Sequence, residues 1–504
     1  MTKAKTEIAA KEALRQTAFA DVPLDQPLVL DLDGTLITSD LLFESFVAAF
    51  RKNPLVALHC LWWIARGGIA LVKARLSDVA NPDLDLIPAN PLVVELAENE
   101  AAAGRLVILA TASDRFIAQR VAKRFGFISR VMASDGTINL KGSRKAEALA
   151  EAYPQGFIYA GDSSADLKVW PKASAAIAVN APKGLLAQAS KLSVPVTMLG
   201  KAPSEARIFL KGIRIQQWVK SALVFAPIPL AGRLLDPTAW ILATLAFIAI
   251  GFLASATYLV NDLADLGDDR RHWSKRNRPL ASGALPIASA LRMIPVMGAI
   301  SLLLAALAGP AVLATVISYG ITTLSYSLAL KRVPLLDTLM LAGMFSLRLL
   351  LGVVAIGAVL SPWLFVFSMA IFLSISLAKR HTEVLRMQKL GKTRAAGRGY
   401  HAADEPLLLG LGAAAAIASV LVLCLYVMND ATLAAHYQTP QFLWIAPMMI
   451  FLWLGRVWLL SQRGELDDDP VAFAVRDRIS IALGGGTALA FALAAIVHIP
   501  AGLS

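Results

Sequence analysis

The sequence predicts an α/β doubly wound N-terminal domain with a helical cap, followed by an all-α membrane domain of nine transmembrane helices. The chain has 504 residues, which is long for one domain. Its 57% hydrophobic content exceeds the roughly 45–50% of soluble proteins. Strand-length apolar runs precede residue 200, and membrane-length runs follow it. We therefore expect domains at residues 1–200, with a cap insert at about 38–100, and at 201–504.

Three short apolar runs define the predicted sheet. "PLVLDLDG", "GRLVILATAS" and "GFIYAGDSSAD" each end in a polar turn and are separated by helical patterns. Strands that alternate with helices predict a parallel sheet, whose carboxyl edge usually binds the ligand. The polar residues at these strand ends are Asp31, Asp33, Thr111, Asp162 and Asp166, with Lys141 and Lys145 after the second strand.

These side chains suit phosphate chemistry. Two carboxylates one residue apart at a strand end can both reach one ligand, here from Asp31 and Asp33. Aspartate oxygens are ligands that Mg²⁺ prefers. A lone "DLDGT" would also fit an ordinary Asp-Gly turn, but the other strand ends add three further motifs in order.

In this order the motifs resemble the haloacid dehalogenase superfamily of phosphatases, over residues 27 to about 185. The resemblance implies that Asp31 attacks phosphorus and that Asp33 protonates the leaving oxygen and then activates water. It implies that Thr111 and a lysine stabilise the phosphoryl oxygens. Lys145 is favoured because "KAEAL" resembles the start of the family's lysine helix, and Lys141 is the alternative. The implied Mg²⁺ ligands are Asp31, Asp33 through its carbonyl, and Asp162. Asp166, at the end of the third strand, is a further oxygen ligand suited to Mg²⁺.

The insert between the first two motifs has a helical pattern, and in this family an insert there forms a cap. Its apolar run contains Trp62, Trp63 and Arg66. This run fits the core of a cap. It also fits a helix on the membrane surface, with aromatic side chains at the interface and cations facing lipid headgroups.

Nine apolar stretches of about 20 residues follow, which is the length needed to span a bilayer. They centre near Phe225, Ile248, Val296, Ile317, Phe345, Met369, Ala416, Ile450 and Ala490. The net charge of +12 is concentrated in alternate loops, a pattern that indicates a membrane protein and not nucleic-acid binding. With no secretory signal pattern, we expect an inner-membrane protein whose N-terminal domain and active sites are cytosolic. The two cysteines, Cys60 and Cys424, predict no disulfide framework.

An acidic motif, "NDLADLGDD", follows the second predicted membrane helix. Asp262, Asp265 and Asp269 are three and four residues apart, so a continuing helix would place them on one face beside Asn261. Clustered acids at a membrane edge suit Mg²⁺ bound to a diphosphate. Asp268 is an alternative ligand, and a solvated loop of mixed charge is the alternative interpretation. Nearby cations that suit the remaining phosphate charge are Arg271, Lys275, Arg276 and Arg278.

The acidic motif, "NRPLASG" after it and the predicted helices resemble the UbiA superfamily of intramembrane prenyltransferases, from about residue 210. That family has a second aspartate-rich motif after its sixth helix. Here the corresponding segment, "SLAKRHTEVLRM", offers Lys379, Arg380, His381 and one acid, Glu383. A basic second motif favours a more anionic guest than an isoprenyl diphosphate with a neutral acceptor. We interpret His381 as a hydrogen-bonding residue, with a role as base as the alternative.

This basic motif and the segment with Lys331, Asp337 and Arg348 are similar to the decaprenyl-phosphate phosphoribosyltransferase branch. That branch implies transfer of 5-phosphoribosyl from phosphoribosyl diphosphate to a polyprenyl phosphate. Lys379 and Arg380 would contact phosphates. Asp337 and Arg348 lie eleven residues apart on one helix side and suggest an intramembrane charged pair or a cavity lining, with helix packing as the alternative.

The two resemblances together predict a bifunctional Mg²⁺-dependent enzyme, in which the N-terminal domain removes the 5-phosphate from the transferred ribose. One alternative is a prenyltransferase that uses an isoprenyl diphosphate, with a phosphatase of separate substrate. Another is a transporter with a regulatory soluble domain. The polyprenyl length and the oligomeric state are left open by the sequence.

Overall fold

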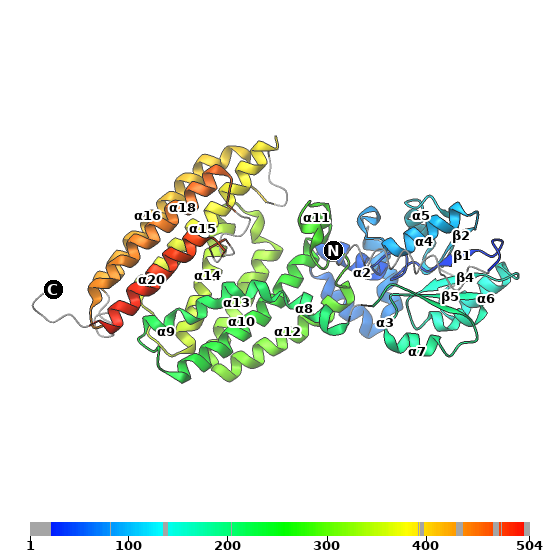
Figure 1. Ribbon diagram of the computed structural model, residues 1–504, viewed down its shortest axis with the longest axis horizontal. Coiled ribbons are helices and arrows are strands. Elements are labelled where there is room, and N and C mark those ends of the chain that lie inside the picture. The colour runs from blue at the N-terminus through cyan, green and yellow to red at the C-terminus, as the bar shows by residue number, and fades with distance from the viewer. Residues whose placement is uncertain are drawn as a thin grey trace, which may run out of the picture. The chain divides into compact units, whose positions relative to one another are not determined.

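The computed structural model describes residues 22–80, 82–134, 140–202, 204–391, 393, 398–429, 437–466, 473–474 and 476–497. Two compact units are present (Figure 1). The first comprises Met1–Gly212 together with Asp262–Arg292, and the second comprises Ile213–Asn261 and Met293–Ser504. The segment with Asp262, Asp265 and Asp269 of the acidic motif therefore belongs to the same unit as the N-terminal part of the chain.

The first unit contains the predicted parallel sheet. Six strands lie in the order β3-β2-β1-β4-β5-β6, and every neighbouring pair is parallel. The central strand β1 pairs with both strands whose ends carry polar motifs. The strands are β1 (Leu28–Leu30), β2 (Val107–Asp114), β3 (Ile128–Ser134), β4 (Ile158–Gly161), β5 (Ala175–Val179) and β6 (Val196–Leu199). This arrangement confirms the doubly wound fold class.

Both faces of the sheet are covered by helices. Leu28 and Leu30 of β1 enter the hydrophobic cluster on one face, and Val29 enters the cluster on the other, as strand alternation requires. Helices α4 (Pro91–Ala102) and α5 (Arg115–Ala122) contribute to the first cluster. Helices α6 (Ser143–Ala152) and α7 (Lys183–Ala189) contribute to the second, and Figure 1 shows them on the opposite side.

The predicted cap is a pair of helices, α2 (Leu41–Lys52) and α3 (Val56–Val79), which share a small core. Asp40 caps the start of α2 by accepting the Leu42 N–H. In α3, Trp63 packs against this core, whereas Trp62 is 51% exposed. The helix therefore has one face in the cap core and a second face, with Trp62, outside it.

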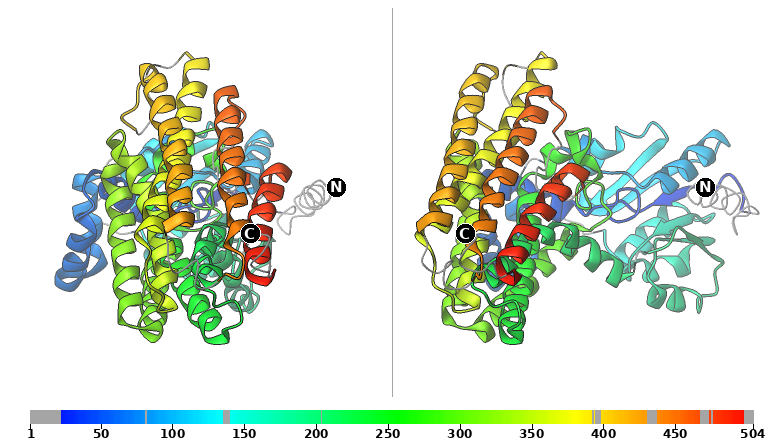
Figure 2. Two further views of the ribbon diagram at one scale, coloured as in Figure 1. Left: turned by 90° about the vertical axis from the view of Figure 1, so that its left-hand side faces the viewer. Right: turned by 60° about the vertical axis from the view of Figure 1, so that its left-hand side comes forward.

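Eight helices among the described residues are long and apolar enough to cross a membrane. They contain α10 (Pro237–Ala264), α12 (Ile287–Ala308), α13 (Pro310–Leu328), α14 (Leu336–Ala355), α15 (Pro362–Lys389), α16 (Glu405–Asn429), α18 (Ile445–Arg463) and α20 (Arg478–Ile496). In both views of Figure 2, α15, α16 and α18 run side by side, and contacts join each pair of them. Proline opens α13 and α15, where its missing N–H costs nothing.

The eight spans are close to the nine that the sequence predicts, and the difference lies near Phe225. That segment is divided into α8 (Glu205–Ile213), the 3₁₀ helix η4 (Ile215–Phe225) and α9 (Pro227–Leu230). Arg214, between the first two, has a left-handed backbone with φ 52°. Helix breaks of this kind remove the segment from a count based on continuous length.

Candidate functional site

The first candidate site lies at the carboxyl edge of the sheet, where β1 ends before Asp31. The Asp31 N–H donates to Ala160 O of β4 at 2.9 Å, which fixes the backbone there. Gly34 follows with φ 77°, and a Cβ atom on it would lie 2.1 Å from Asp162 Oδ2. Only glycine therefore allows the turn after β1 to approach Asp162 so closely. Thr35 donates to the same carboxylate at 3.4 Å.

Lys145, at the start of α6, contacts the predicted nucleophile. Its Nζ donates to Asp31 Oδ1 at 2.8 Å and to the Tyr159 hydroxyl at 2.9 Å. The Lys145 side chain is buried, whereas Lys141 is exposed. Of the two lysines that the sequence suggests, Lys145 is therefore the one beside Asp31. Burial raises the pKa of Asp31, and the charge of Lys145 opposes this rise.

Three carboxylates meet beside this lysine. Among the described residues, ligand oxygens of Asp31, Asp162 and Asp166 lie within 4.8 Å of one another. Burial, followed by the charges of Asp31 and Asp166, raises the pKa of Asp162 to about 8. Such repulsion between buried carboxylates is relieved by a shared cation, so these residues fit Mg²⁺. Asp166 also accepts hydrogen bonds from Tyr159 and Ser163, which orient it.

Asp33 is held apart from that cluster. Its Oδ2 accepts from Ser113 Oγ at 2.8 Å, and its Oδ1 accepts from the Leu41 N–H at 2.9 Å. Burial, with a smaller contribution from Asp40, raises the pKa of Asp33 to about 7. Thr111 is fully buried, and its hydroxyl accepts the Ser113 N–H at 3.0 Å. Asp33 is thus poised to give up or take a proton near neutral pH.

The acidic motif of the membrane domain differs from its predicted form. Helix α10 ends at Ala264, Asp265 has non-helical φ −97° and ψ 4°, and α11 (Leu266–Arg271) begins after it. The prediction of one continuing helix is therefore wrong, because the helix is interrupted at Asp265 within the motif. Asp268 is exposed and pairs with Arg51 at 2.7 Å. In the described part of the chain, the acids of this motif form no three-residue group like that at the sheet.

Two acids of the motif nevertheless share a cation. Arg278 Nη1 lies 3.1 Å from Asp262 Oδ1 and 2.7 Å from Asp269 Oδ2. Both carboxylates are buried. Burial raises the pKa of Asp269 to about 6, although Arg278 opposes the rise. Two buried carboxylates that share one cation offer the oxygen ligands that Mg²⁺ prefers, so Asp262 and Asp269 fit Mg²⁺.

The other cations near the motif are more exposed. Arg271 pairs with Asp83, and both side chains are about half exposed. Lys275 and Arg276 are exposed in the short helix η5 (Lys275–Asn277). Of the predicted phosphate contacts after the motif, Arg278 is the one that the structure brings to the acids.

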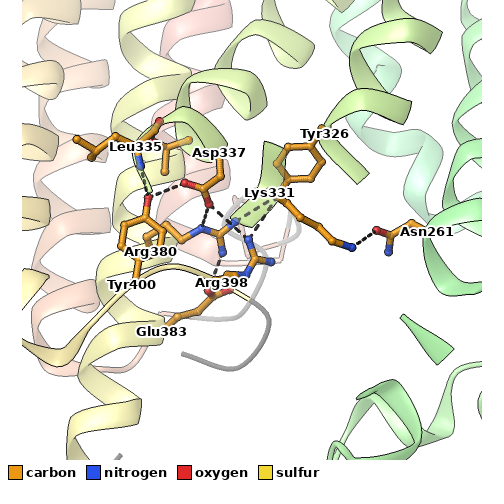
Figure 3. A network of polar contacts seen from close by, with 10 residues as sticks. Asn261, Tyr326, Lys331, Leu335, Asp337, Arg380, Glu383, Arg398 and Tyr400 are labelled. Atoms are coloured by element: carbon orange, nitrogen blue, oxygen red, sulfur yellow. Dashed lines mark hydrogen bonds and ion pairs between the residues drawn. The ribbon is translucent and has the colours of Figure 1, made fainter. Parts of the chain in front are cut away.

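Figure 3 shows a second network, in the other unit, with Asp337 at its centre. Arg380 Nε donates to Asp337 Oδ2 at 2.5 Å, and the Tyr400 hydroxyl donates to Oδ1 at 2.5 Å. Arg380 also pairs with Glu383 at 2.6 Å, and Arg398 lies 3.5 Å from Asp337. Lys331 donates to Asn261 Oδ1 at 3.1 Å, next to Asp262 in sequence. The network brings together five predicted residues: Asn261, Lys331, Asp337, Arg380 and Glu383.

The remaining predicted residues lie elsewhere. Arg348 does not pair with Asp337, and it donates instead to the Tyr319 hydroxyl at 2.5 Å and to Met344 O at 3.1 Å. His381 Nδ1 lies 2.8 Å from Ser461 Oγ, and its Nε2 lies 2.7 Å from Glu405 Oε1. Both ring nitrogens are therefore engaged in hydrogen bonds. Lys379 is partly buried on the same helix, α15.

Comparison with known families agrees with this architecture. Residues 208–484 match the UbiA prenyltransferase family, which is more than half of the chain. The chain belongs to that family. Residues 28–170 match the haloacid dehalogenase-like hydrolase family, so the protein combines a hydrolase domain with an integral membrane transferase domain.

Three relatives extend the comparison. The "Uncharacterized protein y4nM" of Sinorhizobium fredii is 39% identical over 93% of this chain and 91% of its own length. The "Nodulation protein NoeC" of Azorhizobium caulinodans is 30% identical over 56% of this chain and 91% of its own. The "Decaprenyl-phosphate phosphoribosyltransferase" of Corynebacterium glutamicum is 37% identical over 36% of this chain and 56% of its own. The two-domain organisation is thus matched along nearly the whole of one relative.

Several residues that contact the site were not predicted from the sequence. Ser113 lies two residues after Thr111 in β2 and contacts Asp33. The pattern of polar residues at strand ends could therefore have suggested it. Tyr159 is a buried strand residue that links Lys145 to Asp166. Arg398 and Tyr400 reach Asp337 from a loop some 60 residues later, which no local spacing signals.

Proposed function

We propose that this protein transfers 5-phosphoribosyl from phosphoribosyl diphosphate to a polyprenyl phosphate and then removes the ribose 5-phosphate in its N-terminal domain. The observation that carries this proposal is the composition of the network around Asp337. Lys331, Arg380 and Arg398 are its cations, and Asp337 and Glu383 are its acids. Lys379 directly precedes Arg380 on the same helix. An excess of cations favours two strongly anionic substrates, because each brings its own phosphates.

In the proposed transfer, a phosphate oxygen of the acceptor lipid forms a bond to the anomeric carbon of the ribose, and diphosphate leaves. Lys331 and Lys379 contact the phosphates of donor and acceptor. Arg380 is 1% exposed and held by two acids, so its role is to position the network. An acceptor phosphate needs no strong base, which agrees with a His381 ring that is fully hydrogen-bonded.

In the proposed hydrolysis, an Asp31 oxygen attacks phosphorus and displaces the ribose oxygen, which takes a proton from Asp33. Asp33 then removes a proton from the water that hydrolyses the aspartyl-phosphate. Lys145 and Thr111 bind the phosphoryl oxygens. A pKa of about 7 for Asp33 suits both halves of this cycle.

Both proposed reactions use Mg²⁺. Asp31, Asp33 through its carbonyl, Asp162 and Asp166 would hold it in the hydrolase domain, and Asp262, Asp269 and Asp265 would hold it in the transferase domain. When bound, the metal neutralises phosphate charge. With Asp262 and Asp269 as ligands of the metal, Arg278 would contact the diphosphate.

The proposed orientation places both active sites on the cytosolic side of the inner membrane. Basic residues are concentrated in the loops after α11 and after α15, and the loops on the opposite side are nearly uncharged. Soluble phosphoribosyl diphosphate would then reach the transferase from the cytosol.

The experiment that tests this function supplies purified protein in detergent with a polyprenyl phosphate and a radiolabelled donor. Labelled phosphoribosyl diphosphate should give a labelled lipid in the presence of Mg²⁺, and Asp262→Ala should give none. The family name favours one competitor, a prenyltransferase. Label transferred from an isoprenyl diphosphate, and none from phosphoribosyl diphosphate, would establish that competitor instead.

A further inference from the structure

A buried ion pair joins the hydrolase cap to the segment after the acidic motif. Arg270 Nη1 donates to Glu44 Oε2 at 2.9 Å, and Nη2 donates to Oε1 at 2.7 Å. The two side chains are 7% and 4% exposed. Two parallel bonds between a guanidinium and a carboxylate fix orientation as well as distance. Arg270 belongs to α11, and Glu44 lies in the first turn of α2.

Weaker contacts on either side support the same junction. Arg51 at the other end of α2 pairs with Asp268, and Asp83 beyond α3 pairs with Arg271. A Cβ atom on Gly283, which has φ 74°, would lie 2.3 Å from Thr38 Oγ1. The segment Asp262–Arg292 therefore fits the insert at three places besides the buried pair, and it belongs to the same compact unit.

Glu44 has no other role among the contacts of the described residues. Its carboxylate accepts hydrogen bonds from Arg270 alone within that part of the chain. A buried carboxylate is costly unless it is paired, so its presence in the cap is explained by the arginine it holds. Arg270 directly follows Asp269, the acid that shares Arg278 with Asp262.

We propose that Glu44, a residue of the hydrolase cap, is a positioning residue of the transferase. Through Arg270 it holds the backbone that carries Asp269 and Arg278, so the donor's metal-binding carboxylates depend on the hydrolase domain. This rests on the proposed function for the identity of the donor. The dependence on Glu44 is separate from hydrolysis, because the pair does not include Asp31 or Lys145.

The test compares Glu44→Gln with Arg51→Ala in the full-length protein. Gln keeps the size of Glu but loses the charge, and Arg51→Ala removes an exposed pair with the same segment, whose side chains are 41% and 50% exposed. Glu44→Gln should raise the transferase KM for phosphoribosyl diphosphate about tenfold, with hydrolysis of p-nitrophenyl phosphate unchanged. Arg51→Ala should leave both activities within about twofold, as exposed pairs contribute little.

A second readout does not depend on the donor. Mn²⁺ binding, followed by electron paramagnetic resonance in protein that also carries Asp162→Asn, reports on the transferase carboxylates. Glu44→Gln should weaken this binding about tenfold, and Glu44→Asp should restore part of it. Unchanged Mn²⁺ binding in a folded Glu44→Gln protein would overturn the inference. Absence of phosphoribosyl transfer by the unaltered protein would instead reject the proposed function, while the Mn²⁺ titration would still decide the role of Glu44.

Discussion

Lys145 Nζ lies 2.8 Å from Asp31 Oδ1, and both side chains are largely buried. A cation in this position orients the Asp31 carboxylate and stabilises the phosphoryl oxygens as negative charge develops on them. Lys145→Ala should therefore reduce the turnover of a soluble phosphate monoester by about 10²-fold or more. Lys141→Ala, which alters an exposed lysine, should have little effect. The reverse ranking of the two variants would assign the role to Lys141.

The hydrolase should need more Mg²⁺ at lower pH. Its Asp162 has a pKa raised to about 8 by burial and by Asp31 and Asp166. Below pH 8 the metal must displace the proton on Asp162, so the apparent affinity should fall by up to about tenfold per pH unit. Titration of hydrolase activity with Mg²⁺ from pH 6 to 9 measures this slope. An Mg²⁺ requirement that is constant over that range would contradict it.

Arg278 should have opposite effects on metal and on donor. It bridges Asp262 and Asp269, so Arg278→Ala removes a competitor and should tighten Mn²⁺ binding in the absence of substrate. The same variant loses a phosphate contact, and the KM for the donor diphosphate should rise about tenfold. Calorimetry and steady-state kinetics measure the two quantities. A variant that weakens both would indicate that Arg278 merely supports the fold.

The Asp337 network should stabilise the membrane domain. Arg380→Ala leaves Asp337, which is fully buried, without its nearest cation. Breaking a buried pair in this way costs about 3–5 kcal/mol and should lower the apparent Tm in detergent. Arg398→Ala is the matched control, since its contact with Asp337 is longer, at 3.5 Å, and its side chain is more exposed. Equal losses of Tm in the two variants would refute this ranking.

The sequence predicted the sheet well because the relevant signals are local. Apolar runs followed at once by Asp31, Thr111 and Asp162 indicate strand ends, and parallel strands bring such ends to one edge. The choice of Lys145 came from the few residues that open α6. The parallel pairing of β1 with β2 and with β4 brings the ends of these strands to one edge of the sheet.

The membrane domain was harder to predict because its contacts join distant segments. The spacing of three and four residues between the acids suggested that they share one face of a helix. Such spacing does not reveal that the helix is interrupted at Asp265. Arg348 and Asp337 share a helix, yet their hydrogen bonds are to Tyr319 and to Tyr400, which lie in other segments. No local pattern in the sequence marked Glu44, since the arginine that it pairs with is 226 residues away.

The most direct test of the account is the mass of the lipid formed by the unaltered protein and by Asp31→Asn from polyprenyl phosphate and phosphoribosyl diphosphate. Asp31→Asn removes the attacking oxygen of the hydrolase and leaves the transferase residues intact. The unaltered protein should form polyprenyl phosphoribose, and the variant should accumulate the same lipid with one more phosphate. Complete dephosphorylation by Asp31→Asn, or no pentose-bearing lipid from either protein, would contradict the account.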